Sequence, residues 1–158
     1  MWTKIKPYVI WIALALGVGI LAALMTRGSM DIYQTIVTPP LSPPSILFPI
    51  VWTILYVLMG VSAAMIYKKR ELQEDAVKKS LTTYLLSLIA NFVWSLIFFN
   101  VRAYLVAFIW LLLLLYLIID TIVQYKKIDP LAAYLQIPYA LWVAFAGYLN
   151  VAIWLLNK

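Results

Sequence analysis

The chain has 158 residues, of which 66% are hydrophobic and only 11% are charged. Soluble domains are about 45–50% apolar, so this chain lacks the polar residues that would cover a water-soluble domain. The absence of Cys and His excludes disulfides, thiolate or histidine-dependent catalysis, the usual zinc sites and haem ligation by these residues. The net charge of +6 does not indicate nucleic-acid binding, because the basic residues stand at the ends of apolar runs.

Apolar runs long enough to cross a membrane, about 20 residues each, follow one another along the chain. The first spans residues 7–25, and a loop over 26–44 follows it, with Arg27, Asp31 and four prolines. Proline at this density favours stiff, extended backbone, so the loop is either a lid or a plain connector. The second run spans 45–67 and leads into a solvated stretch over 68–79 that holds five basic and three acidic residues.

The run from Leu81 to Val123 is almost wholly apolar. A single helix of that length, at about 1.5 Å per residue, would be about twice as long as the bilayer is thick. The polar cluster Asn100-Val101-Arg102 therefore marks a break between two spans, 81–99 and 103–123. A short charged loop over 124–130 precedes the last span, 131–156.

The sequence thus predicts one all-α membrane domain over residues 1–158, a bundle of five transmembrane helices with a proline-rich loop between the first two. The N-terminus, the second loop and the fourth loop carry nine of the twelve Lys and Arg residues. The positive-inside rule then places the N-terminus in the cytoplasm and the C-terminus outside, assuming a bacterial cell membrane. No internal repeat is visible, which argues against an inverted-repeat carrier.

Acid–base chemistry has little support in the sequence. Five of the six acidic residues fall in predicted loops, and only Asp120 lies within a span, near its end. The chain therefore has no buried carboxylate pair for general acid–base catalysis and no ladder of charges for an ion-coupled transporter. No metal site is predicted.

Aromatic and hydrogen-bonding residues instead recur at helical spacing on three spans, at one level below the proline loop. These candidate ligand-binding residues are Trp52 and Tyr56 on the second span, Asn91 and Trp94 on the third, and Tyr139, Trp142, Ala146 and Asn150 on the fifth. Packing between helices is the alternative for the tryptophans, and an interhelical hydrogen bond is the alternative for each Asn. Their convergence on one level favours a pocket for a flat hydrophobic ligand.

Small residues also recur at a spacing that permits close contact between helices. The pairs are Ala13 and Gly17, Gly60 and Ala64, and Ala103 and Ala107. Such pairs support tight helix packing or a dimer only weakly.

Two segments carry a family resemblance over nearly the whole chain. One is the run from Pro39-Pro40-Leu41-Ser42-Pro43-Pro44 through Phe48-Pro49-Ile50-Val51-Trp52 to Tyr56 and Met59-Gly60; the other contains Pro138-Tyr139, Trp142, Phe145-Ala146 and Leu149-Asn150. With Asn91-Phe92-Val93-Trp94-Ser95 between them, these motifs resemble the translocator protein family, the TspO or tryptophan-rich sensory proteins and the peripheral-type benzodiazepine receptors.

The resemblance implies a five-helix bundle, usually a homodimer, that binds protoporphyrin IX or benzodiazepine-type ligands in a pocket open toward the first loop. It also implies light-dependent porphyrin breakdown in bacterial members, with Trp52 and Trp142 matching the family's pocket tryptophans and Ala146 matching its small pocket residue. Because indoles beside an excited porphyrin can donate electrons or trap reactive products, our hypothesis is that Trp52 and Trp142 carry this breakdown. No covalently bound cofactor is expected, and protoporphyrin IX would be a ligand or a substrate.

Three functions remain open from the sequence. The first is a membrane tetrapyrrole-binding protein, a sensor or scavenger in porphyrin and stress handling, whose partners are the lipid bilayer, a flat hydrophobic ligand and a second copy of the chain. The second is a light-dependent porphyrin-degrading protein. The third is a passive transporter of porphyrin or lipid.

Overall fold

The computed structural model describes residues 1–29 and 35–158, so Asp31 of the first loop lies outside the described residues. Within these ranges, five helical segments are long and apolar enough to cross a membrane. They are α1 (Trp2–Thr26), α3 (Leu47–Tyr67), α4 (Glu74–Ser95) continued by the π-helix η1 (Leu96–Val101), α5 (Tyr104–Ile128) and α6 (Pro130–Asn157). The prediction of a five-helix membrane bundle is confirmed.

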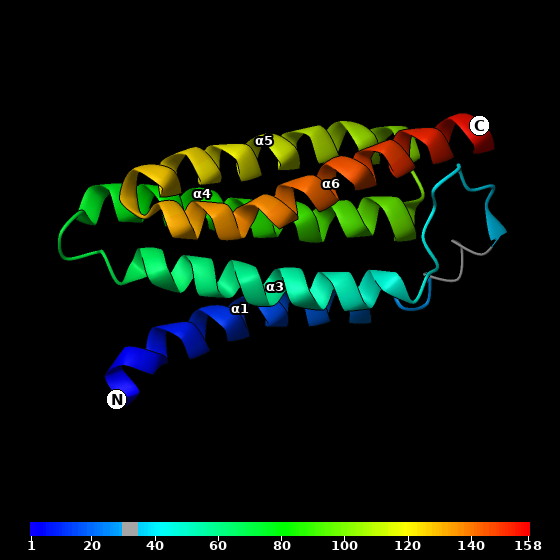
Figure 1. Cartoon of the computed structure of the whole chain (residues 1–158). Helices are drawn as coiled ribbons and strands as arrows, with labels where there is room; N and C mark the ends of the chain where they lie inside the picture. Colours follow the sequence, from blue (N-terminus) through cyan, green and yellow to red (C-terminus); the bar gives the residue numbers. More distant parts are fainter. Residues whose placement is uncertain (30–34) are drawn as a thin grey trace.

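The helices lie alongside one another, so the chain has two clearly different ends (Figure 1). The first loop, the α4–α5 connection and the C-terminus lie at one end, which we call the proline-loop end. The N-terminus, the α3–α4 connection and the α5–α6 connection lie at the other, which we call the lysine end. The lysine end therefore carries nine of the twelve basic residues, the same asymmetry on which the orientation prediction rests.

The predicted break between the third and fourth spans is present, and it has an unusual geometry. The backbone widens into the π-helix η1 after Ser95, and Arg102 then takes the left-handed conformation with φ 61° and ψ 27°. The N–H of Ala103 donates to the carbonyl of Ile97 at 3.3 Å and closes this turn. A π-turn displaces the side chains that follow it, so η1 changes the direction in which Phe98 and Phe99 project.

Several helices extend beyond the predicted spans. α4 begins at Glu74, inside the stretch expected to be solvated, with Glu74 and Asp75 in its first turn, where negative charge is favourable. α5 continues to Ile128, and Asp129 then caps α6 by accepting a hydrogen bond from the Leu131 N–H at 3.2 Å. Pro130 occupies the first turn of α6, a position where its missing N–H costs nothing.

α1 lies at the edge of the bundle against α3, and glycine sets the distance between them. A Cβ on Gly60 would collide with the Ile12 backbone, so the two helices touch here at main-chain distance. The expectation of close contact at Ala13 and Gly17 is wrong within one chain: Ala13 is exposed, and a Cβ on Gly17 would meet nothing within 4 Å. The buried residues of α1 are instead Ala15, Ala22 and Thr26, because the other face of α1 has no neighbour in the monomer.

Candidate functional site

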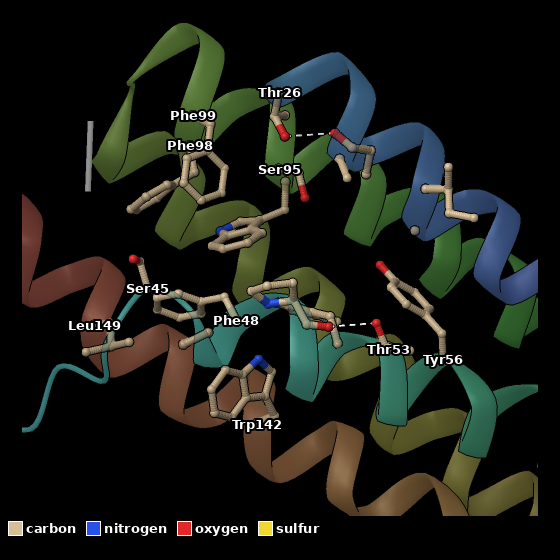
Figure 2. Close-up of a pocket in the computed structure, with 18 of the residues that line it drawn as sticks. Thr26, Ser45, Phe48, Thr53, Tyr56, Ser95, Phe98, Phe99, Trp142 and Leu149 are labelled. Carbon is tan, nitrogen blue, oxygen red and sulfur yellow. Dashed lines mark hydrogen bonds between the residues drawn. The ribbon is translucent and has the colours of Figure 1, made fainter. Parts of the chain in front are cut away.

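A cavity of about 590 Å³ lies in the half of the bundle nearest the proline-loop end. Its walls come from α1, the start of α3, the α4–η1 junction and the second half of α6 (Figure 2). α5 contributes no residue to the lining. This volume falls within the range of about 300–1,000 Å³ that is usual for small-molecule sites.

Three tryptophans form most of the aromatic wall of the cavity: Trp52 from α3, Trp94 from α4 and Trp142 from α6. Trp52 stacks on Tyr56, with ring centroids 5.6 Å apart and an interplanar angle of 29°. Trp142 meets Phe48 edge to face at 6.0 Å, and Figure 2 shows these two rings together on one wall. The rings therefore support one another and leave indole surface facing the cavity.

The wall between α4 and α6 is held by hydrogen bonds through Asn150. The indole N–H of Trp94 donates to the Asn150 side-chain oxygen at 3.0 Å. The Asn150 amide nitrogen donates in turn to the backbone carbonyl of Tyr104 at 2.8 Å. Asn150 thus joins three helices and also lines the cavity.

Six of the eight predicted ligand-binding residues line the cavity, and Asn91 and Tyr139 do not. Asn91 is 1% exposed, and its amide nitrogen donates to the Tyr56 hydroxyl at 3.1 Å. Tyr139 is also 1% exposed and lies edge to face against Trp52 at 6.3 Å. Both residues stand behind the wall and position a lining residue rather than meet the cavity.

α1 contributes a wall that the sequence analysis missed. Its lining residues are Leu16, Gly19, Ile20, Ala22, Ala23 and Thr26. Gly19 is required here because a Cβ at this position would overlap the Tyr56 ring. The signal in the sequence was the small residues Gly19, Ala22 and Ala23, but apolar and small residues on a membrane helix do not distinguish a cavity wall from a lipid-facing surface.

The first loop is attached to α6 at the proline-loop end. The Asn157 side chain pairs with the backbone of Val37, accepting from its N–H at 2.9 Å and donating to its carbonyl at 2.8 Å. The Tyr148 hydroxyl donates to the Pro40 carbonyl at 2.7 Å. Between these attachments and α3 the loop makes a turn, in which the Ser42 N–H donates to the Pro39 carbonyl. Leu41 lies in this turn and takes a left-handed conformation with φ 71°. The described part of the loop is thus an ordered strap rather than a loose connector.

The chemistry of the cavity is that of a binding site for an apolar molecule. None of the described residues that line it is charged, and its polar groups are hydroxyls, the Asn150 amide and indole N–H groups. Among the described residues no group of three acidic side chains could hold a metal ion. Aromatic faces with a few placed donors and acceptors suit a flat molecule that stacks.

These features define an integral membrane protein, a bundle of five helices around a tryptophan-walled cavity. The TspO/MBR family model matches residues 11–155, and the chain belongs to this family. It is 33% identical to the Tryptophan-rich protein TspO of Chlorobaculum tepidum over 98% of both chains. It is also 30% identical to Protein CrtK of Rhodobacter capsulatus, over 88% of this chain and 85% of the relative. It is 33% identical to the Translocator protein of Bos taurus, over 89% of this chain and 83% of the relative.

Proposed function

We propose that the protein is a membrane receptor for tetrapyrroles, with protoporphyrin IX as the model ligand, and that related flat hydrophobic molecules of the benzodiazepine type bind in the same cavity. The observation that carries the proposal is the cavity of about 590 Å³ walled by Trp52, Trp94 and Trp142. A porphyrin is a flat aromatic ring system with two large apolar faces, so indole faces bind it by stacking and by removing its surface from water.

A metal-free porphyrin suits this cavity better than haem. No His or Cys exists in the chain to provide a strong axial ligand to iron. The hydroxyls of Thr26 and Ser95 donate to backbone carbonyls of their own helices, so their oxygens remain as acceptors for the polar edge of a ligand.

Light-dependent degradation of the bound porphyrin is the catalytic extension of this proposal. Light activates the porphyrin, dioxygen is the net oxidant, and the porphyrin is oxidised, so the reaction needs no acid–base pair from the protein. Trp52 and Trp142 are the candidate catalytic residues, because both line the cavity and an indole can relay single electrons. Passive transport of porphyrin or lipid is the competing activity.

Titration of the purified protein with protoporphyrin IX in darkness tests the binding function. We expect saturable quenching of tryptophan fluorescence together with a shift of the porphyrin absorbance band. Illumination of the same sample should then produce new absorbance bands if degradation follows binding. Flux of porphyrin across liposomes in darkness would instead identify a transporter, and an absence of saturable quenching would contradict the binding function itself.

The double variant Trp52→Phe, Trp142→Phe separates binding from degradation. It keeps aromatic rings at both positions, so saturable binding should remain measurable while the light-dependent bands disappear. Trp154→Phe is the matched control, because Trp154 does not line the cavity. Light-dependent bands that persist in the double variant would rule out the role given to these two residues.

A further inference from the structure

The side of the cavity between α1 and α3 differs from its other sides. On the α4 and α6 sides no lining residue is exposed: Phe98 is 4% and Asn150 0% exposed, and others, such as Trp142, are half-buried. Between α1 and α3, lining residues are open to the surroundings: Ile20 is 60% exposed and Ile46 is 66% exposed, and Ala23 and Thr53 are also exposed. The cavity therefore reaches the surface of the bundle between these two helices.

Contacts between α1 and α3 limit this opening on the side of the lysine end. Gly60 touches the Ile12 backbone, and the Trp11 and Tyr67 rings lie 5.9 Å apart. Nearer the cavity, Gly19 packs against the Tyr56 ring, which extends from α3 toward α1 (Figure 2). Beyond this contact, toward the proline-loop end, the cavity lies between the two helices.

The surroundings of the opening are apolar. Leu21 and Leu24 of α1 are 50% and 56% exposed, and Ile50 and Ile54 of α3 are 50% and 55% exposed. These residues belong to helices long and apolar enough to span a membrane, so the opening faces lipid chains rather than water. The described part of the strap is attached to α6 through Val37 and Pro40.

We propose that the opening between α1 and α3 is a lateral entry, through which an amphiphile dissolved in the bilayer passes directly into the cavity. This inference rests on the proposed function, and it narrows the ligand class to molecules that partition into the leaflet at the proline-loop end. Such a ligand exchanges lipid contacts for indole contacts without crossing water. A porphyrin fits this class, because its apolar ring system lies among lipid chains while its carboxylates stay at the interface.

A covalent tether across the opening tests the proposal, because the natural chain has no Cys and only introduced thiols react. Leu24 stands four residues after Ile20, and Ile50 four residues after Ile46, so both flank the opening on the correct helix faces without lining the cavity. The variant Leu24→Cys, Ile50→Cys is joined by flexible bis-maleimides of increasing length in liposomes. Mass spectrometry confirms the cross-link.

The measurement is the rate of binding of protoporphyrin IX preloaded into the liposomes, followed by tryptophan quenching in darkness. The tether should lower the association and the dissociation rate constants together, by about tenfold or more, while the affinity changes by less than about twofold. A tether between Tyr8→Cys and Lys68→Cys is the matched control, because the Lys68 ammonium lies 5.2 Å from the Tyr8 ring at the closed end of the same helix pair. This control should leave both rates unchanged.

Three other results would overturn the proposal, and they are distinguishable. If the untethered protein binds saturably and the tether across the opening leaves both rates unchanged, the ligand enters elsewhere and the proposed function stands. If the untethered protein shows no saturable binding, the proposed function fails and the entry fails with it. Equal slowing by both tethers would show a general effect of cross-linking α1 to α3, and would also contradict a specific entry.

Discussion

The indole N–H of Trp94 donates a hydrogen bond to the side-chain oxygen of Asn150 over 3.0 Å, and this bond joins α4 to α6 at the wall of the cavity. Trp94 is 8% exposed and Asn150 is 0% exposed, so the bond lies inside the bundle, at the wall of the cavity. The Asn150 amide continues the connection to the Tyr104 carbonyl of α5. The same residue therefore shapes the cavity and holds three helices in register.

Replacement of Asn150 by Ala should destabilise the bundle by about 1–2 kcal/mol, because the Trp94 N–H and one carbonyl would lose their partner in an apolar environment. Thermal unfolding in detergent measures the effect. Asn100→Ala is the control, because the hydrogen bond from Asn100 to the Met25 carbonyl is exposed and its loss should cost less. Equal losses for the two variants would contradict the importance of the buried bond.

Replacement of Gly60 by Ala tests the close contact between α1 and α3. The added methyl would overlap the Ile12 backbone, which cannot rotate away, so we expect a loss of about 1–3 kcal/mol or displacement of α1. Gly17→Ala is the matched control on α1, because its methyl meets nothing within 4 Å and Ala favours a helix over Gly by about 1 kcal/mol. Gly17→Ala should therefore unfold at the same temperature as the natural chain or at a higher one. If Gly17→Ala unfolds at a lower temperature than Gly60→Ala, the result would contradict the close contact between α1 and α3.

Replacement of Asn157 by Ala should release the strap from α6 at Val37, while the Tyr148 hydrogen bond to Pro40 remains. The Val37 N–H donates to the Asn157 side chain, so its hydrogen exchange should accelerate strongly in this variant. Asn157→Asp retains the acceptor and loses the donor to the Val37 carbonyl, so it should keep an intermediate degree of protection. Unchanged exchange at Val37 in Asn157→Ala would show that the strap is held by other contacts.

The architecture could be predicted from sequence because each span is long, apolar and bounded by charge or proline. The break at Asn100-Val101-Arg102 was also predictable, since one helix over the whole run would exceed the bilayer. The π-helix η1 was not predictable, because it depends on how Phe98 and Phe99 pack and no residue type encodes it. The residue at which α4 begins, Glu74, was not predictable, because hydropathy locates the membrane and not the end of the helix.

The cavity was predictable on the faces that carry Trp and Asn, and less so elsewhere. Helical spacing placed Trp52, Trp94 and Trp142 on one level, and all three line the cavity. Asn91 and Tyr139 lie behind the wall and not in it. A small rotation of a helix about its axis decides whether a side chain meets the cavity or the core. A helix that is apolar on all sides does not fix that rotation in its sequence. The orientation in the membrane and the predicted homodimer stay predictions.

The replacement of Ala146 by Phe tests most directly whether the cavity is the ligand site. Ala146 lines the cavity on α6, while Ala144, two residues earlier, is exposed and does not line it. Ala146→Phe should fill the cavity and lower the affinity for protoporphyrin IX by about tenfold or more. A tenfold loss of affinity corresponds to about 1.4 kcal/mol of binding free energy. Ala144→Phe should bind protoporphyrin IX with the affinity of the natural chain. Undiminished affinity in Ala146→Phe, with the helical content of both variants preserved, would contradict the account and place the ligand outside the cavity.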